Sequence, residues 1–150
     1  MNKIKQKLYS SCEQYVEQRI ERIKAAMNDL EEDLENETKS SAGDKYETGR
    51  EMINLEWNKL SSQLQQFKML NETLKNAKSR NASSEIQLGS LVKTNMANYF
   101  IAIPAGQLQV AGETYFSIGA GSPIAQLLLK KKAGENFSFN GKTNQIISVE

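Results

Sequence analysis

Apolar residues recur every three or four positions through the first part of the chain. Between residues 3 and 37 no Gly or Pro interrupts the pattern, and the apolar positions step alternately by four and three. This is the heptad spacing of helices that pair along one face. The heptad positions are Val16, Ile20, Ile23, Met27, Leu30 and Leu34. We therefore expect one long helix over residues 3–37.

The same spacing returns after a short polar break. Residues 38–44, TKSSAGD, are small and polar and include a glycine, which favours a loop. Two heptad helices joined by a short loop predict an antiparallel coiled-coil hairpin, with arms roughly 50 Å long. The second helix is expected over residues 45–78, with heptad positions Ile53, Trp57, Leu60, Leu64, Phe67, Asn71 and Leu74.

A different pattern begins after the polar linker at residues 79–85. Short apolar runs separated by Gly, Pro and Asn indicate strands and turns, and the Asn140-Gly141 pair is a strong hairpin signal. We expect an α+β fold, with a hairpin domain over 1–80 (tip at about 38–44) and a small β-rich domain over 81–150. The expected strands are 86–93, 99–103, 107–110, 114–118, 137–139 and 145–149.

One short helix is expected inside the β-rich part. Ser122 is a good N-cap and Pro123 suits the first helical position, so a helix should begin here. Lys130–Lys132 follow at its C-terminal end, where positive charge suits the helix dipole, and Gly134 lets the chain turn. The expected apolar face of this helix is Ile124, Leu127 and Leu128.

Charge separates the two parts of the chain. The formal net charge is +1, but residues 1–80 hold 14 of the 19 basic and 14 of the 18 acidic side chains. The net charge therefore gives no argument for a nucleic-acid partner. The change in charge density supports the domain boundary near residue 80.

The chain has no histidine and a single cysteine, Cys12. This composition excludes Ser-His-Asp and Cys-His catalysis and an internal disulfide, and removes the commonest zinc ligand. We expect Cys12 to be a small buried residue. No apolar run has the length of a signal peptide or membrane span, so we expect a cytoplasmic protein with no membrane partner.

The segment SPIAQLLLKKKAGEN resembles the C-terminal signature of the bacterial Gre transcript-cleavage factors. In that family Ser-Pro-(Ile/Leu)-(Ala/Gly) opens a helix, Gly-Lys-Lys follows, and Gly-Asp leads into a closing strand. Here Lys130 stands at the glycine of Gly-Lys-Lys, and Glu135 stands at the aspartate. The matching residues are Ser122, Pro123, Ile124, Ala125, Lys131, Lys132 and Gly134.

The resemblance implies a fold and a partner. The β-rich part would be the FKBP-like domain, which docks on bacterial RNA polymerase through Ser122–Ala125, Lys131 and Lys132. The hairpin would enter the secondary channel, where two tip carboxylates share a Mg²⁺ with the polymerase active site. The partner would be the polymerase, with nucleic acid contacted only within the elongation complex. The protein would be no enzyme itself, and at most would stimulate RNA cleavage by the polymerase.

The tip sequence allows two alignments with the family. In the first, Tyr46, Arg50 and Glu51 match, and the metal-binding acids fall on Lys39 and Ala42, which cannot bind a cation. The second keeps the acid spacing through Asp44 and Glu47. We favour the first, which puts cleavage activity in question.

Six acids without a base lie close to the predicted tip: Asp29, Glu31, Glu32, Asp33, Glu35 and Glu37. Acids near a helix C-terminus oppose its dipole, so they do not stabilise that end. They form either a solvated face paired with Lys39, Lys45 or Arg50, or an acidic tip in which Glu35 and Glu37 meet Mg²⁺ or basic polymerase surfaces. The sequence leaves both interpretations open.

A second class of function fits the same pattern. The chain could be a coiled-coil adaptor or dimerisation protein whose β-rich domain binds another protein, and a prolyl isomerase or chaperone is a weaker alternative. An intramolecular hairpin predicts a monomer, whereas an adaptor built by zippering separate helices predicts a dimer. Lys130–Lys132 could likewise serve only as a helix cap.

Overall fold

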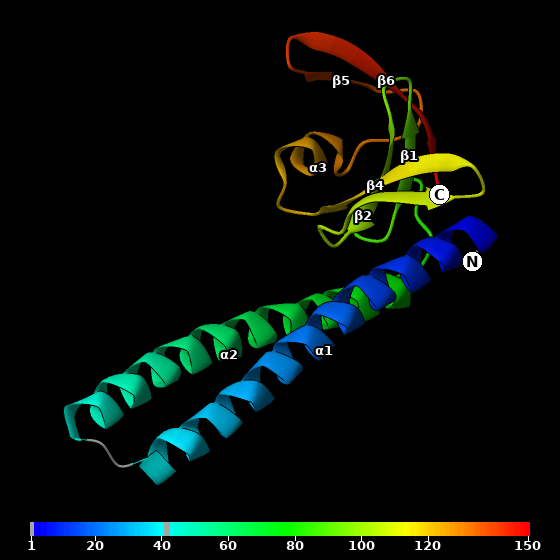
Figure 1. Cartoon of the computed structure of the whole chain (residues 1–150). Coiled ribbons are helices and arrows are strands. Elements are labelled where there is room, and N and C mark those ends of the chain that lie inside the picture. The colour runs from blue at the N-terminus through cyan, green and yellow to red at the C-terminus, as the bar shows by residue number, and fades with distance from the viewer. Residues whose placement is uncertain (1, 41–42) are drawn as a thin grey trace. The chain divides into compact units, whose positions relative to one another are not determined.

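The computed structural model describes residues 2–40 and 43–150, and the side chains of residues 2–36 and 48–150. Two long helices come first, and a six-stranded sheet with one short helix follows (Figure 1). This confirms the predicted α+β class. The elements are α1 (Lys3–Ser40), α2 (Gly43–Ser79), β1 (Leu91–Thr94), β2 (Asn98–Ala102), β3 (Gly106–Val110), β4 (Glu113–Gly119), α3 (Pro123–Leu128), β5 (Asn136–Phe139) and β6 (Lys142–Val149).

The chain divides into two compact units. One combines the N-terminal segment up to Tyr15 with Asn71–Glu150, and the other is Val16–Leu70. Both long helices therefore contribute residues to each unit. The domain boundary near residue 80 stays a prediction.

Within Val16–Leu70, α1 and α2 run in opposite directions (Figure 1). The heptad positions of this unit are buried or half-buried. Val16 and Ile23 are buried and the others up to Phe67 are half-buried, while most positions between them are exposed. The period read from the sequence therefore agrees with the pattern of burial along both helices, while the coiled-coil pairing stays a prediction.

The helix ends near the expected tip differ from the prediction. α1 continues to Ser40 and α2 resumes at Gly43, so the loop expected over residues 38–44 is wrong at both ends. Ser, Thr and Asp each disfavour a helix by about 0.7 kcal/mol at most and Gly by about 1, so these residues do not stop a helix as Pro would, at about 3 kcal/mol. Residues 41 and 42 lie outside the described part of the chain.

The sheet has the strand order β3-β4-β2-β1-β6-β5. β2 and β4 are parallel, with Tyr99 opposite Phe116, and the other neighbours are antiparallel. Parallel neighbours need a crossover connection, and here the segment that contains β3 provides it between β2 and β4.

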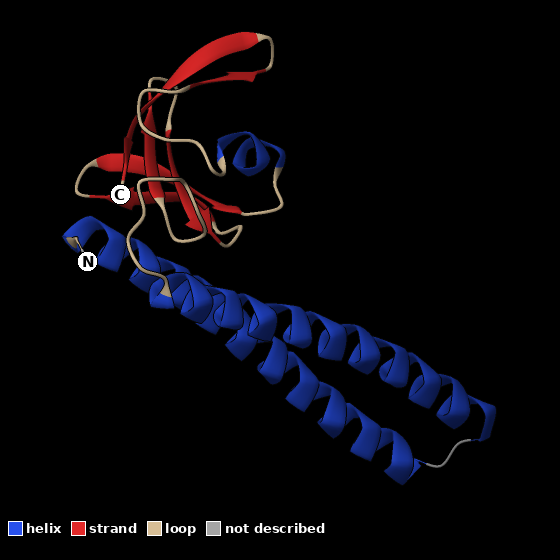
Figure 2. Ribbon diagram, turned by 180° about the vertical axis from the view of Figure 1, so that it is seen from behind, coloured by secondary structure: helices blue, strands red, loops and turns tan. Residues whose placement is uncertain are grey.

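Each face of the sheet packs against a helix within the unit formed by Met1–Tyr15 and Asn71–Glu150. One face carries Phe100, whose ring meets the Tyr9 ring of α1 edge-on at 4.9 Å and 88°. Cys12 also lies on this face, fully buried as predicted, with its Sγ 3.4 Å from Ser117 Oγ. The other face packs against α3 (Figure 2). Its buried core is Ile86, Val92, Tyr99, Ile101, Leu128, Phe137 and Ile146.

Two strands differ from the expected bounds by more than one residue. The strand expected over 86–93 begins only at Leu91, because Gly89 has a φ of 94° and interrupts the extended backbone. The last strand begins at Lys142 rather than 145. The Asn140-Gly141 turn is confirmed, with φ of 51° and 77°, the positive values that a two-residue hairpin of type I′ requires.

Candidate functional site

The Ser122–Glu135 segment is built around the start of α3. Ser122 is the N-cap, with φ −69° and ψ 154°, and its Oγ accepts a hydrogen bond from the Ala125 N–H at 3.3 Å. Pro123 follows within the first turn, where its missing N–H costs no helical bond. The predicted helix start is therefore confirmed.

The end of α3 corrects the expectation for the lysines. The helix stops at Leu128 with Leu129 as its C-cap, and no basic residue lies in its last turn. Lys130 then adopts a φ of 71°, in the left-handed region that favours glycine. The three lysines therefore lie on the segment after the helix, not on its last turn.

Backbone hydrogen bonds hold this lysine segment to Ile86. The Lys130 N–H donates to the Ile86 carbonyl oxygen at 2.8 Å, and the Ile86 N–H donates to the Lys131 carbonyl oxygen at 2.8 Å. Lys130, with its positive φ, donates one of these bonds, and the next residue accepts the other. The left-handed conformation is therefore fixed by contacts on both sides.

Glu135 closes the segment. Its Oε2 accepts from the Lys132 N–H at 2.5 Å, and its own N–H donates to the Lys132 carbonyl oxygen at 3.1 Å. Between them, Gly134 has a φ of 91°, as the predicted turn requires, and donates to the Ile146 carbonyl oxygen at 2.7 Å. The carboxylate at position 135 thus has a structural role as a turn cap.

The exposed surface of the segment differs in part from the expected apolar face. Leu128 is buried and Ile124 is half-buried, but Leu127 is 36% exposed and Ala125 is fully buried in its place. A six-residue helix presents only about one and a half turns to the sheet, so only two positions reach full burial.

The lysine side chains project to solvent. Lys130 and Lys132 are exposed and Lys131 is half-buried. Among the side chains that the structure describes, none of the three has a carboxylate within ion-pair distance. The segment therefore presents unpaired positive charge.

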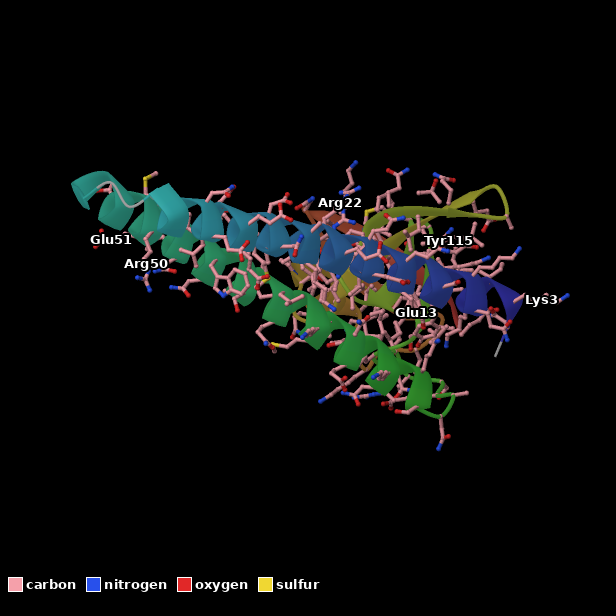
Figure 3. The ribbon with its side chains drawn as sticks, turned by 60° about the horizontal axis from the view of Figure 1, so that its bottom comes forward. Lys3, Glu13, Arg22, Arg50, Glu51 and Tyr115 are labelled. Carbon is pink, nitrogen blue, oxygen red and sulfur yellow. The ribbon has the colours of Figure 1, made fainter. Side chains whose placement is uncertain are left out.

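The predicted tip is described only in part. The side chains of Glu37, Asp44, Tyr46 and Glu47 lie outside the described residues, as do those of Lys39 and Ala42. Arg50 and Glu51 are exposed on α2 (Figure 3), and Glu35 is exposed on α1. The two tip alignments stay untested.

The acidic run of α1 is solvent-facing where it is described. Asp29, Glu31, Glu32, Asp33 and Glu35 are exposed. Within the described side chains, Arg50 forms no ion pair with any of them. Pairing with Lys39 or Lys45 lies outside the described residues. In the described part of the chain, no three His, Cys, Asp or Glu side chains are grouped so that they could hold a metal ion.

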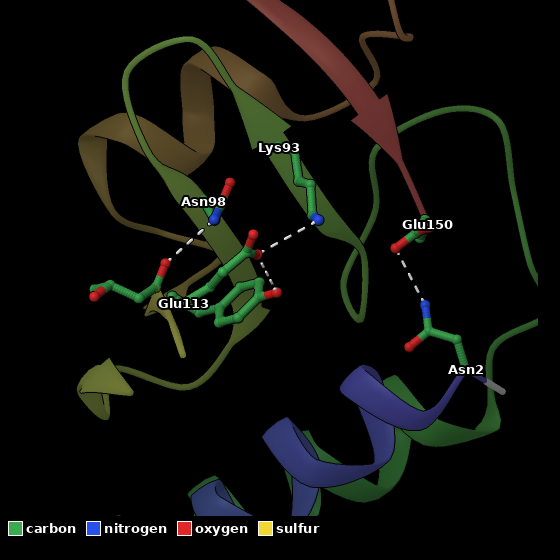
Figure 4. Close-up of polar contacts among 7 residues, drawn as sticks. Asn2, Lys93, Asn98, Glu113 and Glu150 are labelled. Atoms are coloured by element: carbon green, nitrogen blue, oxygen red, sulfur yellow. Dashed lines mark hydrogen bonds and ion pairs between the residues drawn. The ribbon is translucent and has the colours of Figure 1, made fainter. Parts of the chain in front are cut away.

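A second polar group lies across β1 and β4 (Figure 4). The buried Tyr115 hydroxyl donates to Glu113 Oε2 at 2.9 Å, and Lys93 Nζ lies 3.6 Å from the same oxygen. Burial, reinforced by this carboxylate, raises the pKa of Tyr115 to about 12. A protonated tyrosine with a satisfied hydroxyl is a structural feature of the sheet.

A cavity of about 300 Å³ lies beside the first turn of α1. Lys5, Arg80, Ser83, Gln87 and Glu150 are among its lining residues. Burial lowers the pKa of Lys5, whose Nζ donates to the Glu150 carbonyl oxygen at 3.3 Å. Asn2 Nδ2 donates to Glu150 Oε2 at 3.1 Å (Figure 4). The lining mixes both signs of charge, so it selects no ligand class.

The sequence did not indicate two features of the segment. The left-handed Lys130 was not foreseen, although its place at the family's glycine was a signal that could have found it. The Glu135 cap was also missed, because a carboxylate three residues after its donor is too common a pattern to single out.

Comparison with models of known protein families gives no match, and comparison with curated proteins gives none either. No helix in the described part of the chain is long and apolar enough to cross a membrane.

Proposed function

We propose that the chain is a Gre-like factor that binds the secondary channel of a bacterial RNA polymerase and modulates transcription elongation. In this proposal α1 and α2 form the coiled-coil hairpin that enters the channel, and the sheet with α3 is the FKBP-like domain that docks outside. The protein performs no chemistry alone. It either stimulates RNA cleavage by the polymerase or occupies the channel without cleavage.

The backbone at Lys130 is the observation that carries the proposal. The Gre family has a glycine at this position, and Lys130 has a φ of 71°, a positive value that glycine adopts most easily. A sequence resemblance and a backbone conformation thus agree at a residue where the side chain itself differs. Gly134, which matches the family, also has a positive φ.

The element order adds support. Four strands, a short helix and two strands follow the long helices, which is the order that the resemblance implies. The helix begins with the Ser-Pro pair in N-cap geometry. These features fit a Gre-like layout over nearly the whole chain.

The docking surface would consist of the accessible residues of the segment. Pro123 and Lys132 are exposed, and Ser122, Ile124 and Lys131 are half-buried. Ala125 is fully buried, so it supports this surface from inside.

The tip determines which version of the function applies. Cleavage would require carboxylates such as Asp44 and Glu47, with Glu35 and Glu37 nearby, because Mg²⁺ prefers oxygen ligands. The ion would polarise the attacking water. If Lys39 and Ala42 occupy those places, the factor would bind the polymerase without promoting cleavage.

The test is RNA cleavage in backtracked elongation complexes, with polymerase binding scored in parallel. Cleavage that is lost in Asp44→Asn and Glu47→Gln, with binding retained, would establish a cleavage factor. Binding without cleavage would establish a modulator. Absence of binding would contradict both versions of the proposal.

An adaptor or dimerisation protein is a second candidate, because apolar side chains outside the heptad face of α2 are open to solvent. Met52, Leu55 and Met69 are 66%, 70% and 67% exposed. A stable dimer in sedimentation equilibrium, dissociated by Leu55→Glu, would favour this candidate. A monomer would favour the polymerase-binding proposal.

A further inference from the structure

Lys130 keeps a backbone conformation that lysine disfavours. Its φ of 71° brings Cβ close to the following carbonyl oxygen, a contact that glycine avoids. The other non-glycine residues with positive φ in the described chain are Ala111 and Asn140, both in hairpin turns next to a glycine. Lys130 is in no such hairpin. A residue held in a strained conformation at the surface is a candidate for function.

The segment presents its three lysines from a fixed backbone. The backbones of Lys130 and Lys131 are hydrogen-bonded to the backbone of Ile86, and the Lys132 N–H donates to the Glu135 carboxylate. Little further ordering of the backbone is therefore needed when a partner binds, which favours affinity. The Lys130 side chain is exposed and has no carboxylate partner among the described residues.

The surroundings favour a protein partner over nucleic acid. Glu135 and Glu85 lie directly beside the lysines, Glu85 as the bridge partner of Lys132. Three lysines and two acids leave a local net charge of only +1, which is less than the dense positive charge with which proteins bind a phosphate backbone, whereas mixed charges are common at the rim of a protein interface. Leu127, exposed one turn before Lys130, adds the apolar contact typical of a protein interface.

We propose that Lys130 is a partner-contacting residue, and that with Lys131 and Lys132 it recognises an acidic protein surface. The choice of RNA polymerase as the partner rests on the proposed function. The inference adds to that function a residue that does not match the family, together with the charge of the surface on which the segment docks.

The experiment compares four variants of the full chain in equilibrium binding to bacterial core RNA polymerase. Lys130→Gln removes the positive charge and keeps the strained backbone, whereas Lys130→Arg keeps the charge and the strain. Lys130→Gly removes the charge and relieves the strain. The matched control is Lys142→Gln, which removes an exposed positive charge from β6.

At low salt we expect Lys130→Gln and Lys130→Gly to weaken binding about fivefold, and the difference to shrink as salt screens the charges. Lys130→Arg and Lys142→Gln should bind as the wild type does. Lys130→Gly should also raise the melting temperature, which separates the loss of binding from any loss of folding. Equal affinity of Lys130→Gln and the wild type would overturn the inference while leaving the proposed function intact.

A second arm uses a polyglutamate peptide and follows backbone amide shifts by NMR. Shifts confined to Leu129–Glu135 in the wild type and lost in Lys130→Gln would support the inference even if no polymerase bound, in which case only the proposed function fails. No shifts in that segment, when polymerase also does not bind, would overturn the inference. Larger shifts with a single-stranded oligonucleotide of equal charge would overturn it in favour of nucleic acid.

Discussion

Gly89 lies against residues of both long helices, Tyr9 of α1 and Ala77 of α2. A Cβ at this position would lie 2.9 Å from the Ala77 carbonyl oxygen and 2.9 Å from Tyr9 Oη. The Gly89 N–H donates to the Ile101 carbonyl oxygen at 2.6 Å, so the backbone has little room to move. Glycine is needed here for its size as well as for its φ of 94°.

We expect Gly89→Ala to lower the free energy of unfolding by about 3 kcal/mol, because strain and overpacking act together. Gly112→Ala is the matched control, since Gly112 has a φ of 79° but no atom within 4 Å of its Cβ position. That variant should lose only about 1 kcal/mol. Equal losses in urea unfolding of the two variants would show that packing at Gly89 is not tight.

Two buried tyrosines link stability to alkaline pH. Burial raises the pKa of Tyr9 to about 12, and burial with the Glu113 carboxylate raises that of Tyr115 to about 12. In the unfolded chain tyrosine ionises near 10. The folded state therefore holds these protons more tightly, and this contribution is complete below about pH 10 and lost as the pH rises through 12.

We expect the melting temperature to fall as the pH rises from about 10 to 12. The absorbance of ionised tyrosine should appear at a higher pH in the native protein than in the urea-unfolded chain. Glu113→Gln removes the neighbouring negative charge, so the pKa of Tyr115 should fall while that of Tyr9 stays unchanged. Native and unfolded titration curves that coincide would contradict the burial of these hydroxyls.

The sequence predicted the burial of a residue where its type and the local apolar pattern determine that burial. The burial of Cys12 was predicted and is confirmed, because a lone cysteine on an apolar stripe is usually buried. The conformation of Lys130 was not predicted. Its φ depends on hydrogen bonds to Ile86, which lies 44 positions away, and no local pattern contains that information.

At the scale of elements, periodicity predicted the long helices and most strands well. Long apolar periods are strong signals because many positions repeat the same information. The ends of elements depend on single residues and are harder to predict. The end of α1, the start of α2 and the start of β1 all differ from their expected bounds. The short α3 was placed correctly by its cap, but of its expected apolar face only Leu128 is buried.

The N-cap of α3 allows a direct test at this scale. Ser122→Ala removes the hydroxyl that accepts from the Ala125 N–H, and we expect the free energy of unfolding to fall by about 1 kcal/mol. Ser122→Asp keeps an acceptor and should retain most of the stability. If both variants were equally destabilised in urea unfolding, the cap would not be what stabilises this helix start.

At the scale of the whole molecule, the sequence predicted the local structure of only one of the two proposed contact regions, and contact with a partner stays a prediction at both. The Ser122–Glu135 segment was visible because its cap, lysines and turn glycine are local features, and the structure shows how they are held. The tip could not be fixed, because the sequence allows two alignments that place different residues at the expected metal-binding positions, and the side chains of residues 37–47 lie outside the described part of the chain.

Binding to RNA polymerase tests the central proposal most directly. We would measure the affinity of the full chain for bacterial core polymerase, alone and with the secondary channel already occupied by another channel-binding factor. The proposal expects binding that the occupant abolishes. Absence of binding, or binding that the occupant leaves unchanged, would contradict a Gre-like function.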